Sequence, residues 1–266
     1  MTFFKIHSSG NDFVVVDSRR EGWGELNPAR IAALCDRRKG IGADGLLALD
    51  DHQAGNLKIR YFNADGFPGE LCGNGAMCAV WMARYLGMSN ENQLNLQVWE
   101  RSYRAGFGDN PRACWIELGG EESLPEEVLR ELADKGFGRM AFFEVGVPHL
   151  VVEMTAELSG LDIQKWGPFF RRFKGFPKGA NVNFVRRGSG NTLQVRVYER
   201  GVEAETQACG TGAVSSAFFG RRFYGLEGRV QVQSPGGILQ VDLDHNQALR
   251  GRLHGEVTLV FRGELI

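Results

Sequence analysis

Two cysteines stand in nearly the same surroundings, half a chain apart. Cys72 lies in "PGELCGNGAMCA" and Cys209 lies in "ETQACGTGAVSS". In both segments Gly-polar-Gly-Ala follows the cysteine and leads into residues with helical apolar spacing, which predicts a thiol at the N-terminus of a helix. The N–H groups at such an end attract anions and lower the pKa of a thiol. Each segment therefore predicts a reactive sulfur beside a site for a carboxylate.

Two similar thiols suit a reaction that is itself nearly symmetric. One thiolate would remove the α-proton of an amino acid from one face, and the other thiol would return a proton to the opposite face. The helix N-termini would hold the α-carboxylate while negative charge develops on carbon. Closure around the ligand would exclude water. For Cys35, Cys78 and Cys114 we expect the other common role of cysteine, a small buried apolar side chain.

The elements around the two cysteines also occur twice, in the same order and 134 to 137 residues apart. They are a glycine turn with a β-rich run, a helix, a strand that leads to the cysteine, and a strand beyond the cysteine's own helix. The pairs are 10–17 and 146–153, 27–40 and 162–175, 58–63 and 195–200, and 96–99 and 230–233. For the first helix we expect Asn27 as N-cap, a basic last turn and Gly40 as the stop.

This repeat predicts an α/β (α+β) fold of two lobes related by an approximate two-fold axis. We expect an N-terminal lobe over 1–118 and a C-terminal lobe over 119–256. Segment 119–136 is acidic and is expected to connect the lobes and to contain a short helix. The final segment, 257–266, is expected to return to the first lobe as a strand.

Composition excludes several classes of function. Lys and Arg number 31 against 32 Asp and Glu, so no overall positive field exists to bind a nucleic acid. No apolar run reaches the length of a signal peptide or a membrane span, which favours a cytoplasmic protein with no membrane partner. The five cysteines contain no CxxC pair and the five histidines no HExxH, so we expect no metal and no disulfide framework.

Along nearly the whole chain these segments resemble the diaminopimelate epimerases. The resemblance rests on "KIHSSGNDFVVVD", "CDRRKGIGADGLL", "RYFNADGFPGELCGNGAMC", "GVPHLVV", "GANVNFV" and "YERGVEAETQACGTGA". It implies two lobes, each a mixed sheet wrapped around a central helix, with the active site in the cleft between them. It also implies epimerisation of LL-2,6-diaminopimelate to the meso form, for lysine and peptidoglycan precursors, without pyridoxal phosphate or any other cofactor.

The resemblance also implies roles for individual residues. Cys72 and Cys209 would be the catalytic acid and base, with Glu199 and His149 flanking the thiols and setting their protonation. The carboxylate at the reacting end of the substrate would be bound by the backbone N–H groups of Gly73, Asn74, Gly210 and Thr211. The side chain of Asn11 would also contact the reacting end. The distal end would be held by Asn63, Asn181 and Arg200.

Some positions depart from the family pattern and leave alternatives open. Val147 stands where an Asn often binds the distal end, Met77 and Phe67 replace an Arg and a Ser, and Gly45 replaces a Gln of some members. The side chain of Val147 cannot donate a hydrogen bond, although its backbone N–H could take that place, so the substrate is left open. A cofactor-independent racemase of another amino acid, such as histidine, is the first alternative. A cysteine hydrolase that pairs a thiol with His149 and a two-lobed amino-acid-binding module are the others. The expected assembly is a homodimer.

Overall fold

The computed structural model describes residues 1–20, 23, 25–53, 55–123, 126–133 and 135–265. Contacts divide the chain into two compact units. Unit 1 comprises Met1–Glu117 with His254–Ile266, and unit 2 comprises Leu118–Leu253. The boundaries expected from the sequence, after residues 118 and 256, lie one and three residues from this division. Within the described residues, no helix combines the length and the apolarity that a membrane crossing requires.

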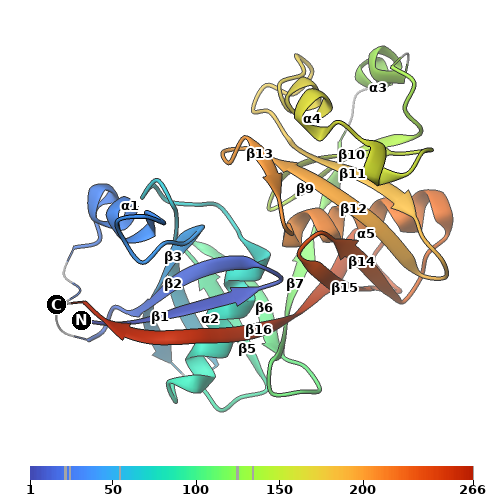
Figure 1. The fold of residues 1–266 in the computed structure, drawn as a ribbon. Helices are drawn as coiled ribbons and strands as arrows, with labels where there is room; N and C mark the ends of the chain where they lie inside the picture. The colour runs from blue at the N-terminus through green and yellow to red at the C-terminus, as the bar shows by residue number, and fades with distance from the viewer. Residues whose placement is uncertain (21–22, 24, 54, 124–125, 134, 266) are drawn as a thin grey trace. The chain divides into compact units, whose positions relative to one another are not determined.

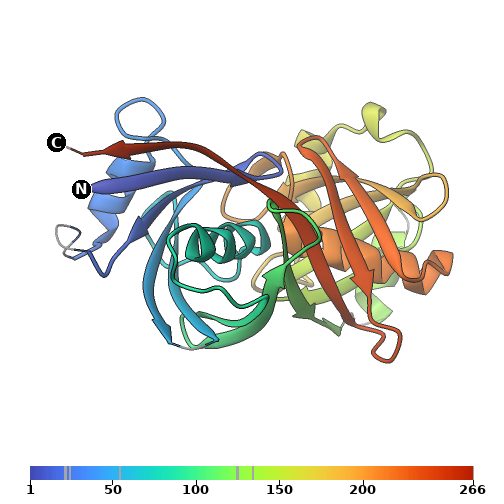
Figure 2. The same cartoon turned by 90° about the horizontal axis from the view of Figure 1, so that it is seen from below.

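Unit 1 is a curled sheet around a central helix. Its strands follow the order β1-β2-β3-β4-β5-β6-β7, and β16 is a neighbour of both β7 and β1. Helix α2 packs against β1, β2, β3, β4 and β6, inside the curl of the sheet (Figure 2). The elements are β1 (Thr2–Ser8), β2 (Asn11–Asp17), α1 (Pro28–Cys35), β3 (Gly45–Gln53), β4 (Asn56–Asn63), α2 (Gly73–Tyr85), β5 (Gln93–Val98), β6 (Arg101–Phe107), β7 (Ala113–Gly119) and β16 (Arg250–Glu264).

Unit 2 has the same design. Its strand order is β8-β9-β10-β11-β12-β14-β15 with β13 on β12, and α5 packs against β9, β10, β11, β12, β14 and β15 (Figure 1). The elements are β8 (Glu121–Glu122), α3 (Glu126–Ala133), β9 (Met140–Val145), β10 (Val147–Glu153), a 3-10 turn (Leu158–Gly160), α4 (Ile163–Arg171), β11 (Asn181–Arg187), β12 (Thr192–Glu199), β13 (Ala204–Thr206), α5 (Gly210–Tyr224), β14 (Arg229–Ser234) and β15 (Gly237–Leu243).

Strand pairing confirms that the chain repeats one fold. In unit 1 the pairs β1/β2, β2/β3, β3/β4, β4/β5 and β5/β6 alternate antiparallel and parallel. In unit 2 the pairs β9/β10, β10/β11, β11/β12, β12/β14 and β14/β15 alternate in the same way. Both β2 and β10 follow a glycine with positive φ, Gly10 at 81° and Gly146 at 71°. The expected α/β fold of two like units is therefore correct.

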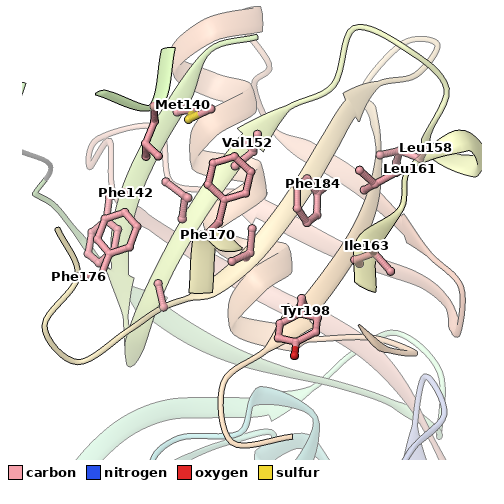
Figure 3. Packing of buried hydrophobic residues seen from close by; sticks show 14 residues of the cluster. Met140, Phe142, Val152, Leu158, Leu161, Ile163, Phe170, Phe176, Phe184 and Tyr198 are labelled. Atoms are coloured by element: carbon pink, nitrogen blue, oxygen red, sulfur yellow. The ribbon is translucent and has the colours of Figure 1, made fainter. Parts of the chain in front are cut away.

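Alternation along the strands gives each sheet two apolar faces. In unit 2, Leu150 and Val152 of β10 and Phe184 of β11 join the cluster that α4 covers with Phe170, and Figure 3 shows the Phe170 ring beside Val152. The residues that alternate with them face the other side, toward α5. This geometry places every second residue of β10 and β11, including His149, beneath the helix that begins beyond Cys209.

Helix α1 begins where the sequence predicts and ends earlier. Asn27 caps it by accepting a hydrogen bond from the Arg30 N–H at 3.0 Å, but the helix ends at Cys35 and not at Gly40. The carboxylate of Asp36 accepts the N–H groups of the next turn, those of residues 38 and 39, at 2.7 and 2.8 Å. This local bonding competes with helix continuation. The expected basic last turn therefore lies beyond the helix.

Two other elements differ in length from the sequence predictions: α4 is shorter than expected, and β16 is longer. Helix α4 ends at Arg171, with Arg172 as its C-cap, and not at 175. Strand β16 begins at Arg250, and it pairs antiparallel with β1 from Ser8 and Val257 to Thr2 and Glu264. The final strand therefore returns to unit 1, as predicted.

Candidate active site

Cys72 is the N-cap of α2, where the sequence places it. Its backbone is extended, with φ −110° and ψ 113°, and its sulfur accepts the Gly75 N–H at 3.4 Å. The thiol also contacts a side chain of β2, because Sγ donates to Oδ1 of Asn11 at 3.3 Å. The side chain of Asn74, fully buried in the first turn of α2, donates to the same Oδ1 at 3.4 Å. Three predicted site residues are thus together in unit 1.

A carboxylate fixes the amide orientation of Asn11. Nδ2 of Asn11 donates to Oδ2 of Asp44 at 2.8 Å. Because an ionised carboxylate only accepts hydrogen bonds, Nδ2 must face Asp44, and Oδ1 must face Cys72. A thiolate would repel that oxygen, so this contact favours the protonated thiol at Cys72.

Charged neighbours hold Asp44 in place. The Arg37 guanidinium binds Asp12 at 2.7 Å and Asp44 at 2.6 Å, and Lys5 forms a further ion pair with Asp12. Burial raises the pKa of Asp12, but hydrogen bonds from Arg37 and Lys5 outweigh it and hold this pKa well below its usual range. The pKa of Arg37 is raised, mainly because its guanidinium donates hydrogen bonds to the carboxylate of Asp12. Asp12 and Arg37 therefore stay charged at neutral pH, and Arg37 holds the carboxylate of Asp44 as a fixed acceptor for Asn11.

Cys209 occupies the matching place in unit 2, as N-cap of α5 with φ −125° and ψ 115°. Its sulfur lies 3.5 Å from Oγ1 of Thr211. A Cβ at Gly212 would lie 3.3 Å from this sulfur and only 2.3 Å from Oδ1 of Asn183. Glycine at 212 therefore allows α5 to begin directly against β11.

A buried hydrogen-bond chain leads from Asn183 to Cys209. Nδ2 of Asn183 lies 3.0 Å from Nδ1 of His149, and Nε2 of His149 lies 2.9 Å from Oγ1 of Thr211. Burial, with the nearby charge of Arg200, lowers the pKa of His149 to about 3, so the imidazole is neutral at working pH. The structure thus brings two predicted site residues, His149 and Thr211, to Cys209. Thr211 contacts the sulfur directly, and His149 reaches it through Thr211.

The other predicted residues of unit 2 lie at the ends of β11 and β12. Oδ1 of Asn181 accepts the backbone N–H of Arg200 at 2.8 Å, and the guanidinium of Arg200 donates to the Lys178 carbonyl at 3.3 Å. The carboxylate of Glu199 accepts the hydroxyl of Thr206 at 2.6 Å. The three residues form one group, in which Asn181 holds the backbone that carries Arg200.

Asn63 is the last residue of β4, at the start of the turn that follows it, and is exposed. Its N–H donates to the Phe67 carbonyl at 3.0 Å, its carbonyl accepts from Gly66 at 2.9 Å, and Oδ1 accepts the Tyr61 hydroxyl at 3.0 Å. These contacts give Asn63 a structural role in the turn.

Sequence reasoning missed Asp44 and Asn183. Both stand inside motifs that carry the resemblance, and Asn183 follows Asn181 by two residues in a strand, so both face the same side. That alternation was the available signal. The expectation for the remaining cysteines is correct, since Cys35, Cys78 and Cys114 are buried. Burial raises the pKa of Cys35 to about 11, raises that of Cys114 to about 12, and raises that of Cys78 well above its ordinary value.

Several solved structures share this fold, and proteins described as epimerases are among them. A predicted epimerase from Pseudomonas aeruginosa aligns with 100% of this chain and 99% of its own at a TM-score of 0.73 and 18% identity. A hydroxyproline epimerase from Agrobacterium vitis, with bound trans-4-hydroxy-L-proline, aligns with 100% and 90% at a TM-score of 0.66 and 12% identity. At such identities the likeness shows the fold alone.

Sequence comparison is more specific. The profile named Diaminopimelate epimerase matches residues 3–100 and 141–260. Curated diaminopimelate epimerases from Chlorobaculum tepidum and Aquifex aeolicus are 37% and 34% identical, over 97% and 100% of this chain and 98% of each relative. One from Methanocella arvoryzae is 35% identical over 99% of this chain and 96% of its own. The chain belongs to the diaminopimelate epimerase family and is an isomerase, and the comparisons do not favour a racemase of another amino acid.

Proposed function

We propose that this chain interconverts LL- and meso-2,6-diaminopimelate, a step in the synthesis of lysine and of peptidoglycan precursors. Family membership supports the substrate. One observation supports the chemistry: Cys72 and Cys209 are the N-caps of the two helices that the repeat makes equivalent. A thiol at that position lies beside unpaired N–H groups, which favour an anion. Both halves of the chain thus supply the same reactive group.

The reaction needs one thiolate and one thiol. The thiolate of one cysteine takes the α-proton and becomes a thiol, and the electron pair left on carbon is delocalised into the α-carboxylate. The other thiol then donates its proton to the opposite face of the same carbon and becomes a thiolate. The N–H groups of Gly73, Asn74, Gly210 and Thr211 would bind the carboxylate while that charge develops. These proton transfers balance without a metal or a cofactor.

The remaining residues would select the substrate. Arg200 offers a cation to the distal carboxylate, and Asn181 fixes the backbone from which that side chain projects. Asn63 would complete the distal site. Since both reactive thiols must stay reduced, we also propose a cytoplasmic location. A homodimer is proposed as the assembly.

Proton exchange in deuterated buffer tests this function. The wild type should convert LL-diaminopimelate to the meso form with deuterium entering at the inverted carbon. Cys72→Ser and Cys209→Ser should each lower kcat by about 10²- to 10⁴-fold, because serine is a far weaker acid than cysteine. Cys114→Ala, which changes a buried thiol away from both helix ends, is the matched control and should stay active.

Three results would overturn the proposal. Fast racemisation of another amino acid, with negligible turnover of diaminopimelate, would exclude diaminopimelate as the substrate. A single essential cysteine with a covalent intermediate would indicate a hydrolase. Calorimetric binding of diaminopimelate without exchange of its α-hydrogen would indicate a binding module.

A further inference from the structure

Three polar side chains are buried together at the start of α5, one from the helix itself and two from the strands beneath it. His149 and Asn183 are 0% exposed and Thr211 is 3% exposed. They come from β10, β11 and α5, and hydrogen bonds join them in a line that ends at the sulfur of Cys209. The direction of each hydrogen bond in this line decides whether the sulfur receives a proton or gives one.

The first direction is set by the amide of Asn183. Its Nδ2 lies 3.3 Å from the backbone carbonyl of Leu150 and 3.0 Å from Nδ1 of His149. A carbonyl oxygen can only accept, so the amide nitrogen, and not the amide oxygen, must face it. A reversed amide would bring two oxygens together. Asn183 therefore donates to Nδ1 of His149.

The remaining directions follow from the first. Because Nδ1 of His149 accepts a hydrogen bond, the proton of the neutral imidazole must be on Nε2. Nε2 then donates to Oγ1 of Thr211 at 2.9 Å. Since Oγ1 already accepts this hydrogen bond, the hydroxyl proton of Thr211 is available to the Cys209 sulfur, 3.5 Å away. The first two hydrogen bonds thus run toward Thr211, and a hydrogen bond donated by its hydroxyl would continue the same direction to the sulfur.

The equivalent positions of unit 1 show that the fold does not require these polar groups. Strand pairing aligns Phe13 of β2 with Gly45 of β3, and His149 of β10 with Asn181 of β11, so Leu47 corresponds to Asn183. The positions of His149 and Asn183 are thus held by phenylalanine and leucine in unit 1. These two apolar side chains, both 0 to 1% exposed, pack beneath the glycine that corresponds to Gly212 in the other helix.

The polar arrangement also has a cost. Within the described part of the chain, the buried Oδ1 of Asn183 has no hydrogen-bond partner. A buried polar atom without a partner destabilises a fold, whereas an apolar side chain of similar size does not. Leucine at the same place in unit 1 avoids this cost. A role at the sulfur explains why unit 2 carries the amide.

We propose that Asn183 is a positioning residue that fixes the tautomer of His149, directs the Thr211 hydroxyl proton to Cys209 and so favours the thiolate there. This deepens, and rests on, the proposed two-thiol reaction, because it makes Cys209 the resting base. Arg200, whose positive charge acts on His149, is the charged group that opposes protonation of the imidazole. A neutral imidazole is what the line of hydrogen bonds requires.

The tautomer can be measured on the wild-type protein at neutral pH. Long-range ¹H–¹⁵N correlation spectra distinguish a protonated Nε2 from a protonated Nδ1, and His149→Gln identifies the signal by its loss. We expect the proton on Nε2. A proton on Nδ1, or a positively charged ring at neutral pH, would overturn the proposal. This outcome does not depend on whether diaminopimelate is the substrate.

The second measurement is the pH dependence of alkylation of Cys209 and Cys72 by iodoacetamide, resolved by peptide mass spectrometry. Asn183→Leu, which copies Leu47, should move the Cys209 midpoint up by about one pH unit, because one hydrogen bond to a charged group is lost. Thr211→Val should cause a similar shift and keep the backbone N–H of the helix start. In the double variant the midpoint pH for Cys209 should rise no further than in either single variant, because both substitutions interrupt the same chain of hydrogen bonds.

Ser216→Ala is the matched control. Ser216 is also 0% exposed in α5, and its hydroxyl donates to the Gly212 carbonyl at 2.7 Å. Removing this hydroxyl deletes a buried hydrogen bond of the same helix that is not part of the hydrogen-bond chain from Asn183 to Cys209. The midpoint pH for alkylation of Cys209 should therefore not change. An equal shift in Ser216→Ala, or none in both Asn183→Leu and Thr211→Val, would show a merely structural role and overturn the proposal.

Discussion

The two thiols have opposite hydrogen-bond partners although their helices hold equivalent places in the two units. Cys72 gives a hydrogen bond to the amide oxygen of Asn11, whose orientation Asp44 fixes. The sulfur of Cys209 is within reach of a hydroxyl, Thr211, at the end of the chain from His149. The repeat therefore determines where a sulfur lies, while a few side chains beneath each helix determine its protonation.

This difference matters because the proposed reaction needs one proton on two sulfurs. Two thiols with the same pKa would spend much of their time both protonated or both ionised. A carbonyl oxygen opposite Cys72 and a hydroxyl opposite Cys209 favour one arrangement, with the proton on Cys72. Substrate bound in the other stereochemical form would need the reverse arrangement, so the preference must be modest.

Making unit 2 like unit 1 should have the largest effect. His149→Phe with Asn183→Leu copies the apolar pair Phe13 and Leu47 beneath α5. We expect kcat/KM to fall by about ten- to a hundredfold, because Thr211 loses its orientation and Cys209 loses its donor. The free energy of unfolding should stay within about 1 kcal/mol of wild type, since both polar partners leave together. Steady-state rates and urea unfolding measure the two effects.

The single variant His149→Phe is the control for this exchange. It leaves the buried amide of Asn183 without its histidine partner, so it should be less stable than the double variant by about 1–3 kcal/mol. If the double variant kept full activity, the polar chain would have no part in catalysis.

Adding one methyl group to each helix start should sharpen the comparison. In Gly212→Ala the new Cβ would lie 2.3 Å from Oδ1 of Asn183, so β11 or α5 must shift. In Gly75→Ala it would lie 3.3 Å from the Phe13 ring and 3.4 Å from Leu47. We expect Gly212→Ala to lower the free energy of unfolding by about 1–3 kcal/mol through overpacking. Gly75→Ala should lower it by less, because the higher helix propensity of alanine offsets part of the crowding. Equal losses in urea unfolding would contradict this difference in crowding between the two helix starts.

Releasing Asn11 should bring the thiols closer in pKa. In Asp44→Ala the amide loses the acceptor that fixes it, so Nδ2 can turn toward the sulfur, and a nearby negative charge is lost. Both changes stabilise the thiolate, so the pKa of Cys72 should fall by about one pH unit. Asp44→Asn keeps an oxygen acceptor and should give a smaller shift. Alkylation of Cys72 against pH measures it, and an upward shift would contradict the assigned amide orientation.

Sequence predicted the features that repeat and missed those that depend on packing across strands. The glycine turns, the cap of α1 and both cysteine helix starts follow from local residue types. The end of α1 did not, because Asp36 bonds the next turn instead of continuing the helix. Asp44 and Asn183 were missed since their roles exist only once β2 pairs with β3 and β10 with β11. The opposite proton directions at the two sulfurs depend on amide orientations, which no spacing of residues encodes.

Val147 offers the mildest test of the comparison. It holds in unit 2 the position that Asn11 holds in unit 1, directly after the glycine turn, and the family pattern often has Asn there. Val147→Asn should lower KM for diaminopimelate by about two- to fivefold with kcat unchanged, because an added hydrogen bond to the distal end acts equally before and during the reaction. Val147→Ala removes the same apolar bulk without adding an amide and should not lower KM. A fall in kcat in Val147→Asn would mean instead that the new amide competes for the hydrogen-bond chain at Cys209, and that the apolar residue protects it.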